Sequence, residues 1–156
     1  MRKWLLLFTV IIFTTLQLIW PTWLSPFNSK PDLLLVLVVS LVFYFNFKTA
    51  LLFAILAGLL KDAFLPSTAA INTISFSLWS YLTFRLSSQI STEHSYVRLF
   101  IILIVAVLNN IVIGIQSLNS GNFIPLGIFL RNLLIPSVYT AAISPLVFKL
   151  TKRIAV

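Results

Sequence analysis

The 156-residue chain contains no cysteine, only three acidic residues and a single histidine. The absence of cysteine excludes disulfides and thiol chemistry. Charged residues make up only 9% of the chain, whereas soluble domains carry about 25%. Hydrophobic residues make up 60%, and the mean hydropathy is +1.06. This composition indicates an integral membrane protein with little room for a soluble domain.

Sequence signals for catalysis are also missing. The single histidine, His94, lies beside Glu93 in a polar loop and lacks the further ligands that a metal ion needs. Neither a phosphate-binding loop nor a nucleophile motif occurs in the chain. The sequence therefore predicts no enzyme, no metal site and no cofactor.

Positive charge dominates, with a formal net charge of +8. The basic residues stand singly between apolar runs, although nucleic-acid binding would gather them in one patch. Isolated basic residues between apolar runs are typical of membrane topology signals.

Five apolar blocks can be marked, at residues 4–20, 33–60, 71–84, 97–115 and 127–148. The first follows a basic N-terminus but lacks a cleavage site, so it is interpreted as an uncleaved span. The second block is ambiguous, because it fits either one long tilted helix or two short helices that turn near Asn46-Phe47-Lys48.

Lysine and arginine positions distinguish these alternatives. With two short helices, both termini are cytoplasmic, and eight basic residues lie inside against three outside. The inner set is Arg2, Lys3, Lys48, Arg85, Arg98, Lys149, Lys152 and Arg153, and the outer set is Lys30, Lys61 and Arg131. A single helix would place four inside and six outside. It would also leave Lys48 at mid-membrane, where a charged side chain costs roughly 3 kcal/mol of free energy.

The predicted fold is therefore an all-α, six-span helical bundle that forms one transmembrane domain over residues 1–156. Its expected spans are 4–20, 33–46, 49–62, 71–84, 97–115 and 127–148, and both termini are expected in the cytoplasm. Helices of about 15 residues reach only roughly 22 Å, so much of the second block is expected to pack inside the bundle.

Polar residues within the apolar blocks are candidate interaction sites. Asp62 lies one turn after Gly58 on the same helix face, near the expected outer surface. Arg131 is expected at a similar depth, which suggests an ion pair with Asp62. The alternatives for these charges are a helix cap, snorkelling to the interface, and a ligand or transport site. Asn109 and Asn110 lie in the middle of the fifth span, where helix-to-helix hydrogen bonding is the favoured role and a polar site the alternative.

Three segments together carry a family resemblance. They are Pro31-Asp32-Leu33-Leu34-Leu35, Ala57-Gly58-Leu59-Leu60-Lys61-Asp62-Ala63-Phe64, and Asn72 with Tyr81 leading to Arg85. This pattern resembles the bacterial rod shape-determining protein MreD family. The specific part covers about 55 residues, and the layout covers the whole chain. The matching residues are Pro31, Asp32, Gly58, Asp62, Asn72 and Arg85. Where the family has a small-Gly-Leu turn, this chain has Ala69-Ala70-Ile71.

The resemblance implies a non-enzymatic subunit of the cell-elongation (rod) complex in the bacterial inner membrane. Its implied partner is the bitopic scaffold protein MreC and, through it, the actin-like MreB filament, the glycosyltransferase RodA and its paired transpeptidase. The six matching residues would serve packing and orientation.

An alternative remains open, because the family also resembles the substrate-binding membrane subunits of energy-coupling-factor vitamin transporters in span number and termini. Those subunits carry an Ala-x-x-x-Ala face in the first span, and this chain has no such pair there.

Overall fold

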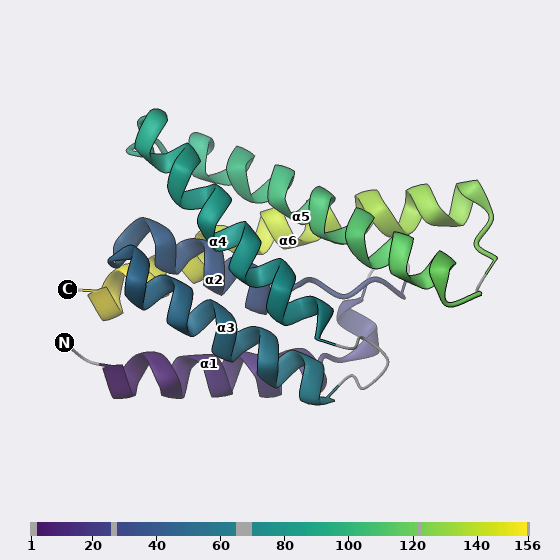
Figure 1. Ribbon diagram of the computed structural model, residues 1–156, viewed down its shortest axis with the longest axis horizontal. Coiled ribbons are helices and arrows are strands. Elements are labelled where there is room, and N and C mark those ends of the chain that lie inside the picture. The colour runs from purple at the N-terminus through teal and green to yellow at the C-terminus, as the bar shows by residue number, and fades with distance from the viewer. Residues whose placement is uncertain (1–2, 26–27, 65–69, 122, 156) are drawn as a thin grey trace.

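The computed structural model describes residues 3–25, 28–64, 70–121 and 123–155, so Arg2 and Ala69 lie outside the described residues. Within these ranges all regular secondary structure is helical, as predicted, and the chain contains six α-helices (Figure 1). Their bounds are α1 Lys3–Leu18, α2 Leu33–Tyr44, α3 Phe47–Phe64, α4 Ile71–Gln89, α5 Ser95–Asn119 and α6 Leu126–Ala155, with a short 3-10 turn, η1, at Thr22–Leu24.

The ambiguous second block forms two helices, α2 and α3. The chain leaves helical geometry at Phe45, whose backbone is extended, and α3 begins two residues later. The backbone N–H of Ala50 donates to the Asn46 carbonyl at 3.0 Å, which starts the first turn of α3. Lys48 therefore lies at the beginning of a helix, as the charge argument requires.

Helix α2 forms the centre of the bundle. Every residue from Leu33 to Val42 is buried, and α2 packs against each of the other five helices. A helix that is apolar on all sides lies either in a protein core or in a membrane, and here the other helices enclose it. At 12 residues, α2 is about 18 Å long, so neighbouring helices shield it where it is too short to span the bilayer.

Four of the remaining helices form two closely packed pairs, α3 with α4 and α5 with α6, and α1 packs against α2 and α3. Two helices, α5 and α6, are long and apolar enough to cross a membrane, whereas the apolar α1 and α2 are shorter. Figure 1 shows the α5–α6 pair projecting beyond the other helices at the end opposite the chain termini. The molecule therefore has a short part, α1 to α4, and a long part, α5 and α6.

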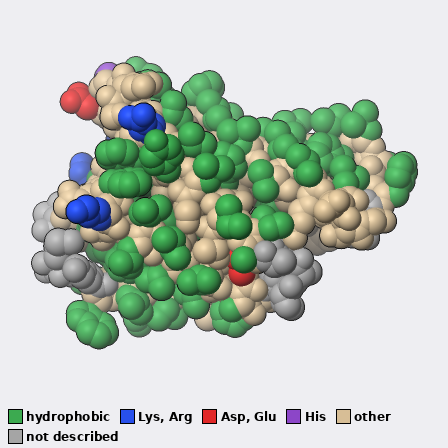
Figure 2. All heavy atoms as spheres, viewed as in Figure 1, with side chains coloured by type: hydrophobic (Ala, Val, Ile, Leu, Met, Phe, Trp, Pro, Cys, Tyr) green, Lys and Arg blue, Asp and Glu red, His purple; other side chains and the backbone are tan. Residues whose placement is uncertain are grey.

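Both chain ends lie at the same end of the bundle, with the α2–α3 and α4–α5 connections (Figure 1). Hydrophobic side chains cover most of the face in Figure 2, and the Lys and Arg side chains visible there lie toward this end. This arrangement agrees with the even number of spans expected from the sequence. The side of the membrane that this end faces stays a prediction.

All six helices end at residues other than those expected, and the differences are largest for α4, α5 and α6. Arg85 was expected to end the fourth helix, but α4 continues by one turn to Gln89. Ser87 and Ser88 donate hydrogen bonds to the carbonyls of Phe84 and Arg85, which supports this extra turn. Helices α5 and α6 also extend beyond their apolar runs. The apolar pattern shows where a chain leaves the hydrocarbon layer. The helix itself can continue beyond that point until it reaches a stop signal.

Candidate functional site

The first polar site is built on Asp32, the residue that precedes α2. One carboxylate oxygen, Oδ1, accepts a hydrogen bond from the Leu35 backbone N–H at 3.2 Å, so Asp32 is the N-cap of α2. The same oxygen accepts from Gln17 Nε2 of α1 at 3.3 Å. Gln17 in turn accepts from the Leu34 backbone N–H at 3.1 Å, which ties the end of α1 to the first turn of α2.

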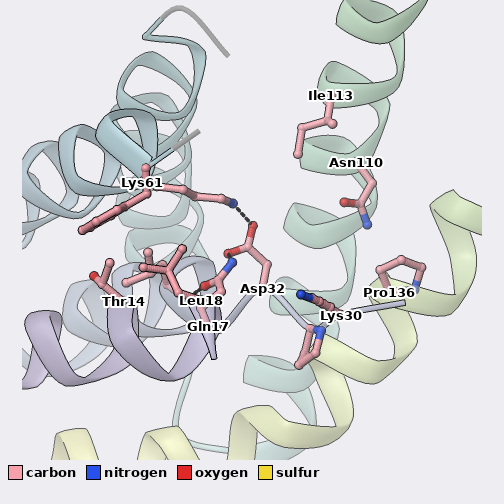
Figure 3. Close-up of a pocket in the computed structure, with 12 residues that line it drawn as sticks. Thr14, Gln17, Leu18, Lys30, Asp32, Lys61, Asn110, Ile113 and Pro136 are labelled. Carbon is pink, nitrogen blue, oxygen red and sulfur yellow. Dashed lines mark hydrogen bonds and ion pairs between the residues drawn. The ribbon is translucent and has the colours of Figure 1, made fainter. Parts of the chain in front are cut away.

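The second oxygen of Asp32 binds a buried lysine. Lys61 Nζ, from the last turns of α3, lies 2.5 Å from Asp32 Oδ2 (Figure 3). The two side chains are only 10% and 14% exposed, respectively. The ammonium of Lys61 also lies 5.0 Å from the centre of the Phe76 ring of α4. Because the pair is largely removed from solvent, each charge depends on the other for compensation.

Residues of α4, α5 and α6 complete this cluster. Asn109 Nδ2 lies 3.5 Å from Asp32 Oδ2, and its carbonyl oxygen accepts from Trp79 Nε1 at 3.1 Å. The backbone N–H of Asp32 donates to Thr140 Oγ1 at 3.1 Å. The cluster, here termed the Asp32 hub, takes one residue from each part of the bundle: Gln17, Asp32, Lys61, Trp79, Asn109 and Thr140.

The hub has little capacity for chemistry. A carboxylate offers about four lone-pair sites, and those of Asp32 face Lys61, Gln17, Asn109 and the Leu35 N–H. Within the described residues, no group of three His, Cys, Asp or Glu side chains is placed to hold a metal ion. The arrangement holds six helix segments in fixed positions relative to one another.

The second polar site joins α3 to α4 around Asp62. One oxygen accepts from the Asn72 backbone N–H at 3.2 Å and from its side-chain amide at 2.8 Å. The other accepts from the Thr73 backbone N–H at 2.9 Å and its hydroxyl at 2.6 Å. A carboxylate at a helix N-terminus satisfies free N–H groups and favours the helix dipole. Asp62 therefore caps α4 from the end of the preceding helix.

Gly58 makes this cap possible, because α3 and α4 touch there. A Cβ atom at Gly58 would lie 2.4 Å from Thr73 Cα and 2.8 Å from Thr73 N. Both are backbone atoms, so they have little freedom to move aside. Gly58, Asp62, Asn72 and Thr73 form a second unit, here termed the α3–α4 clamp.

The turn into α4 explains the departure from the family pattern. Ala70 has φ 62° and ψ 10°, in the left-handed region where the family pattern has glycine. A residue with a Cβ costs roughly 1–2 kcal/mol in this conformation. The chain therefore has the left-handed turn that glycine favours, with alanine, the smallest residue that has a Cβ, in that position.

The expected ion pair between Asp62 and Arg131 is not found among the described residues, where Lys61 and Asp32 form the ion pair. Asp62 is instead directed at the start of α4. Arg131 is exposed in the second turn of α6, which packs mainly on α5 and α2. Similar expected depth in the membrane did not imply proximity within the bundle.

The other expected residues fall into two groups. Pro31 is buried beside the hub, and Asn110 links α5 to α6 by donating to Ser137 Oγ at 2.9 Å. Arg85 is exposed toward the end where the termini lie, 6.0 Å from the Tyr81 ring, and contacts neither polar site. The motif residues thus form the hub and the clamp, with Arg85 apart from both.

Lys61 is the main functional residue that the sequence did not predict. It was expected only as one of the three basic residues on the outer side. A signal was present, because Ala50, Ala54, Ala57 and Lys61 recur every three or four residues and are all buried. Lys61 therefore continues an inward-facing stripe of α3. Gln17, Trp79 and Thr140 were also missed, and their single polar positions in apolar helices carry no comparable pattern.

The described part of the chain has six helices with an apolar exterior, and two of them are long enough to span a bilayer. These features define a helical membrane protein. Comparison with protein families makes this class specific. The chain belongs to the family of the rod shape-determining protein MreD, whose model matches residues 1–154. No curated protein and no solved structure matches the chain.

This membership confirms the resemblance seen in the sequence. Proteins of the family are non-enzymatic, multi-pass proteins of the cytoplasmic membrane that determine cell shape. Membership of the rod complex follows from the family.

Proposed function

We propose that this chain binds the bitopic scaffold protein MreC in the bacterial cytoplasmic membrane and so helps to control peptidoglycan synthesis by the rod complex. The observation that carries the proposal is the family match over residues 1–154. MreB, RodA and the elongation transpeptidase would be reached indirectly, through the scaffold. Both termini would face the cytoplasm, in a six-span arrangement similar to that of the energy-coupling-factor substrate-binding subunits.

The Asp32 hub supports an assembly role over a chemical one. Its carboxylate is filled by partners from within the chain, and the hub holds segments from all six helices. A bundle held in this way presents an outer surface of fixed shape, which a partner helix can recognise by packing.

The outer faces of α5 and α6 offer such a surface. A shallow groove of about 550 Å³ runs between them and is lined mainly by Tyr96, Phe100, Leu103, Val138, Ala142 and Pro145. Small residues such as Ala142 let a transmembrane helix approach closely, and in lipid close packing contributes much of the association energy. We take this groove as the first surface on which to seek the MreC contact.

The test is quantitative co-purification of MreC with a tagged copy from native membranes in mild detergent. We expect MreC and the elongation synthases with the wild-type chain. Ala142→Trp should lower the MreC recovered, while Leu59→Trp, at an exposed position of α3, should not. Absence of MreC from the wild-type sample would refute the proposal. Equal recovery with both variants would exclude only the α5–α6 groove.

A substrate-binding subunit of a vitamin-type transporter is the second candidate, favoured by a cavity of about 320 Å³ beside the hub. The same purification distinguishes the two functions. Recovery of paired ATPases and a coupling subunit, in place of MreC, would establish the transporter function.

A further inference from the structure

The cavity beside the Asp32 hub lies at the end of the bundle opposite the chain termini. It has a volume of about 320 Å³ and is bounded by α1, the segment before α2, and α3, α5 and α6. Lys30, Asp32, Lys61 and Asn110 surround it, as Figure 3 shows. Its other walls are mostly apolar and include Leu18, Phe64, Ile113 and Pro136. Apolar walls with a few convergent polar groups are typical of ligand sites.

The charges around this cavity favour an anion. Asp32 and Lys61 neutralise each other at 2.5 Å, and the carboxylate of Asp32 is occupied by its partners in the hub. Lys30 is exposed at the rim and forms no ion pair within the described part of the chain. The net charge of the lining residues is therefore about +1, carried by a lysine that has donors to spare.

Asn110 adds an acceptor to the same space. Its amide nitrogen donates away from the cavity, to Ser137 Oγ at 2.9 Å and toward the Leu133 carbonyl at 3.4 Å. Its side-chain oxygen is directed toward the cavity in Figure 3. An anion that also carries a hydroxyl would match both Lys30 and this oxygen.

Helix lengths place the cavity near lipid headgroups. Helix α1 has 16 residues and is about 24 Å long, whereas α5 has 25 residues and is about 37 Å long. The hydrocarbon core of a bilayer is about 30 Å thick, so lipid beside the short helices must thin. The cavity lining includes Leu18 and Phe64, the last residues of α1 and α3, whereas α5 continues beyond the lining residue Ile113. Thinning lowers headgroup phosphates toward the level of Lys30.

We propose that this cavity binds a phosphate-bearing, hydroxyl-containing anionic headgroup, with Lys30 as the cationic contact and Asn110 as acceptor for the hydroxyl. The group can come from a membrane lipid or from a soluble phosphate ester. Carbon atoms next to the phosphate would contact Leu18 and Phe64. The inference does not depend on MreC binding.

The test is native mass spectrometry of the purified protein titrated separately with phosphatidylglycerol, phosphatidylcholine and glycerol 3-phosphate. We expect the wild-type protein to retain phosphatidylglycerol in preference to phosphatidylcholine. Lys30→Gln should weaken this binding about tenfold, the scale of one charge-assisted hydrogen bond. Arg131→Gln removes the same charge outside the cavity lining and should leave binding unchanged. A thermal midpoint equal to wild type would show that each variant is folded.

The outcomes separate the two sources of the anion. Preference for phosphatidylglycerol over glycerol 3-phosphate, lost with Lys30→Gln, identifies a lipid site. Equal binding of these two anions, also lost with Lys30→Gln, identifies a soluble phosphate ester. Equal retention of phosphatidylcholine and phosphatidylglycerol, or identical effects of the Lys30 and Arg131 variants, would overturn the proposal.

Discussion

The buried pair between Asp32 and Lys61 yields the sharpest prediction, which compares Asp32→Asn, Lys61→Met and the double variant. Lys61→Met keeps an unbranched side chain of similar length but leaves the carboxylate of Asp32 without its counter-charge. Asp32→Asn removes the negative charge yet keeps the cap of α2, since asparagine caps a helix as well as aspartate does. It therefore leaves the ammonium of Lys61 uncompensated.

The magnitude follows from burial. Side-chain exposures of 10% and 14% place the pair close to the buried limit, where removal of one partner costs about 3 kcal/mol. The double variant removes both charges and keeps the cap. We therefore expect it to be destabilised by only about 1 kcal/mol relative to wild type, less than either single variant. The effects should therefore be strongly non-additive, as expected for residues in direct contact.

The assay is thermal unfolding of the three variants and the wild type in the same detergent. A loss of 3 kcal/mol corresponds to roughly 6–12 °C in a chain of this size. If each single variant melted within about 2 °C of wild type, or if the two effects simply added, the pair would be a solvated one. The Asp32 hub would then not depend on a buried ion pair.

Three further substitutions test the clamp, the turn into α4 and the hub by the same assay. Gly58→Ala should destabilise by about 2 kcal/mol because its Cβ would meet the backbone of α4, while Gly127→Ala, with open space around it, should not; equal midpoints would contradict the close contact. Ala70→Gly should stabilise by about 0.5 kcal/mol, since glycine relieves the left-handed strain but has more freedom when unfolded; a lower midpoint would count against strain there. Asn109→Leu should destabilise the protein by about 1 kcal/mol, because it removes the hydrogen bonds of Asn109 with Trp79 and Asp32. An unchanged midpoint would show that these bonds contribute nothing to stability.

The sequence predicted those features that depend on local pattern. The placement of Lys48 separated one long helix from two short ones, because an isolated charge at mid-membrane is expensive. The expected second span began at residue 33, and α2 does begin there, with Asp32 as its N-cap. An aspartate directly before an apolar run is a typical helix-start signal.

The partners of the charged residues required the tertiary structure. Asp32 and Lys61 are 29 residues apart, and nothing local brings them together. Asp62 and Arg131 looked suitable because both were expected near the outer surface, yet depth does not specify which helices are neighbours. The inward stripe of α3 indicates that Lys61 is buried, but its partner depends on how α2 packs against α3.

The enclosed position of α2 has a consequence for biosynthesis. This core helix is held by α6, which is made well after it, because Thr140 and Thr151 of α6 bind Asp32 and Ser40 across separations of 108 and 111 residues. During synthesis, α2 therefore lacks these α6 contacts, and has only earlier helices such as α1 and α3 beside it, until α6 has been made. A chain that stopped before Leu126 would leave its most deeply enclosed helix uncovered on one side, so we expect it to be degraded and not to function in part.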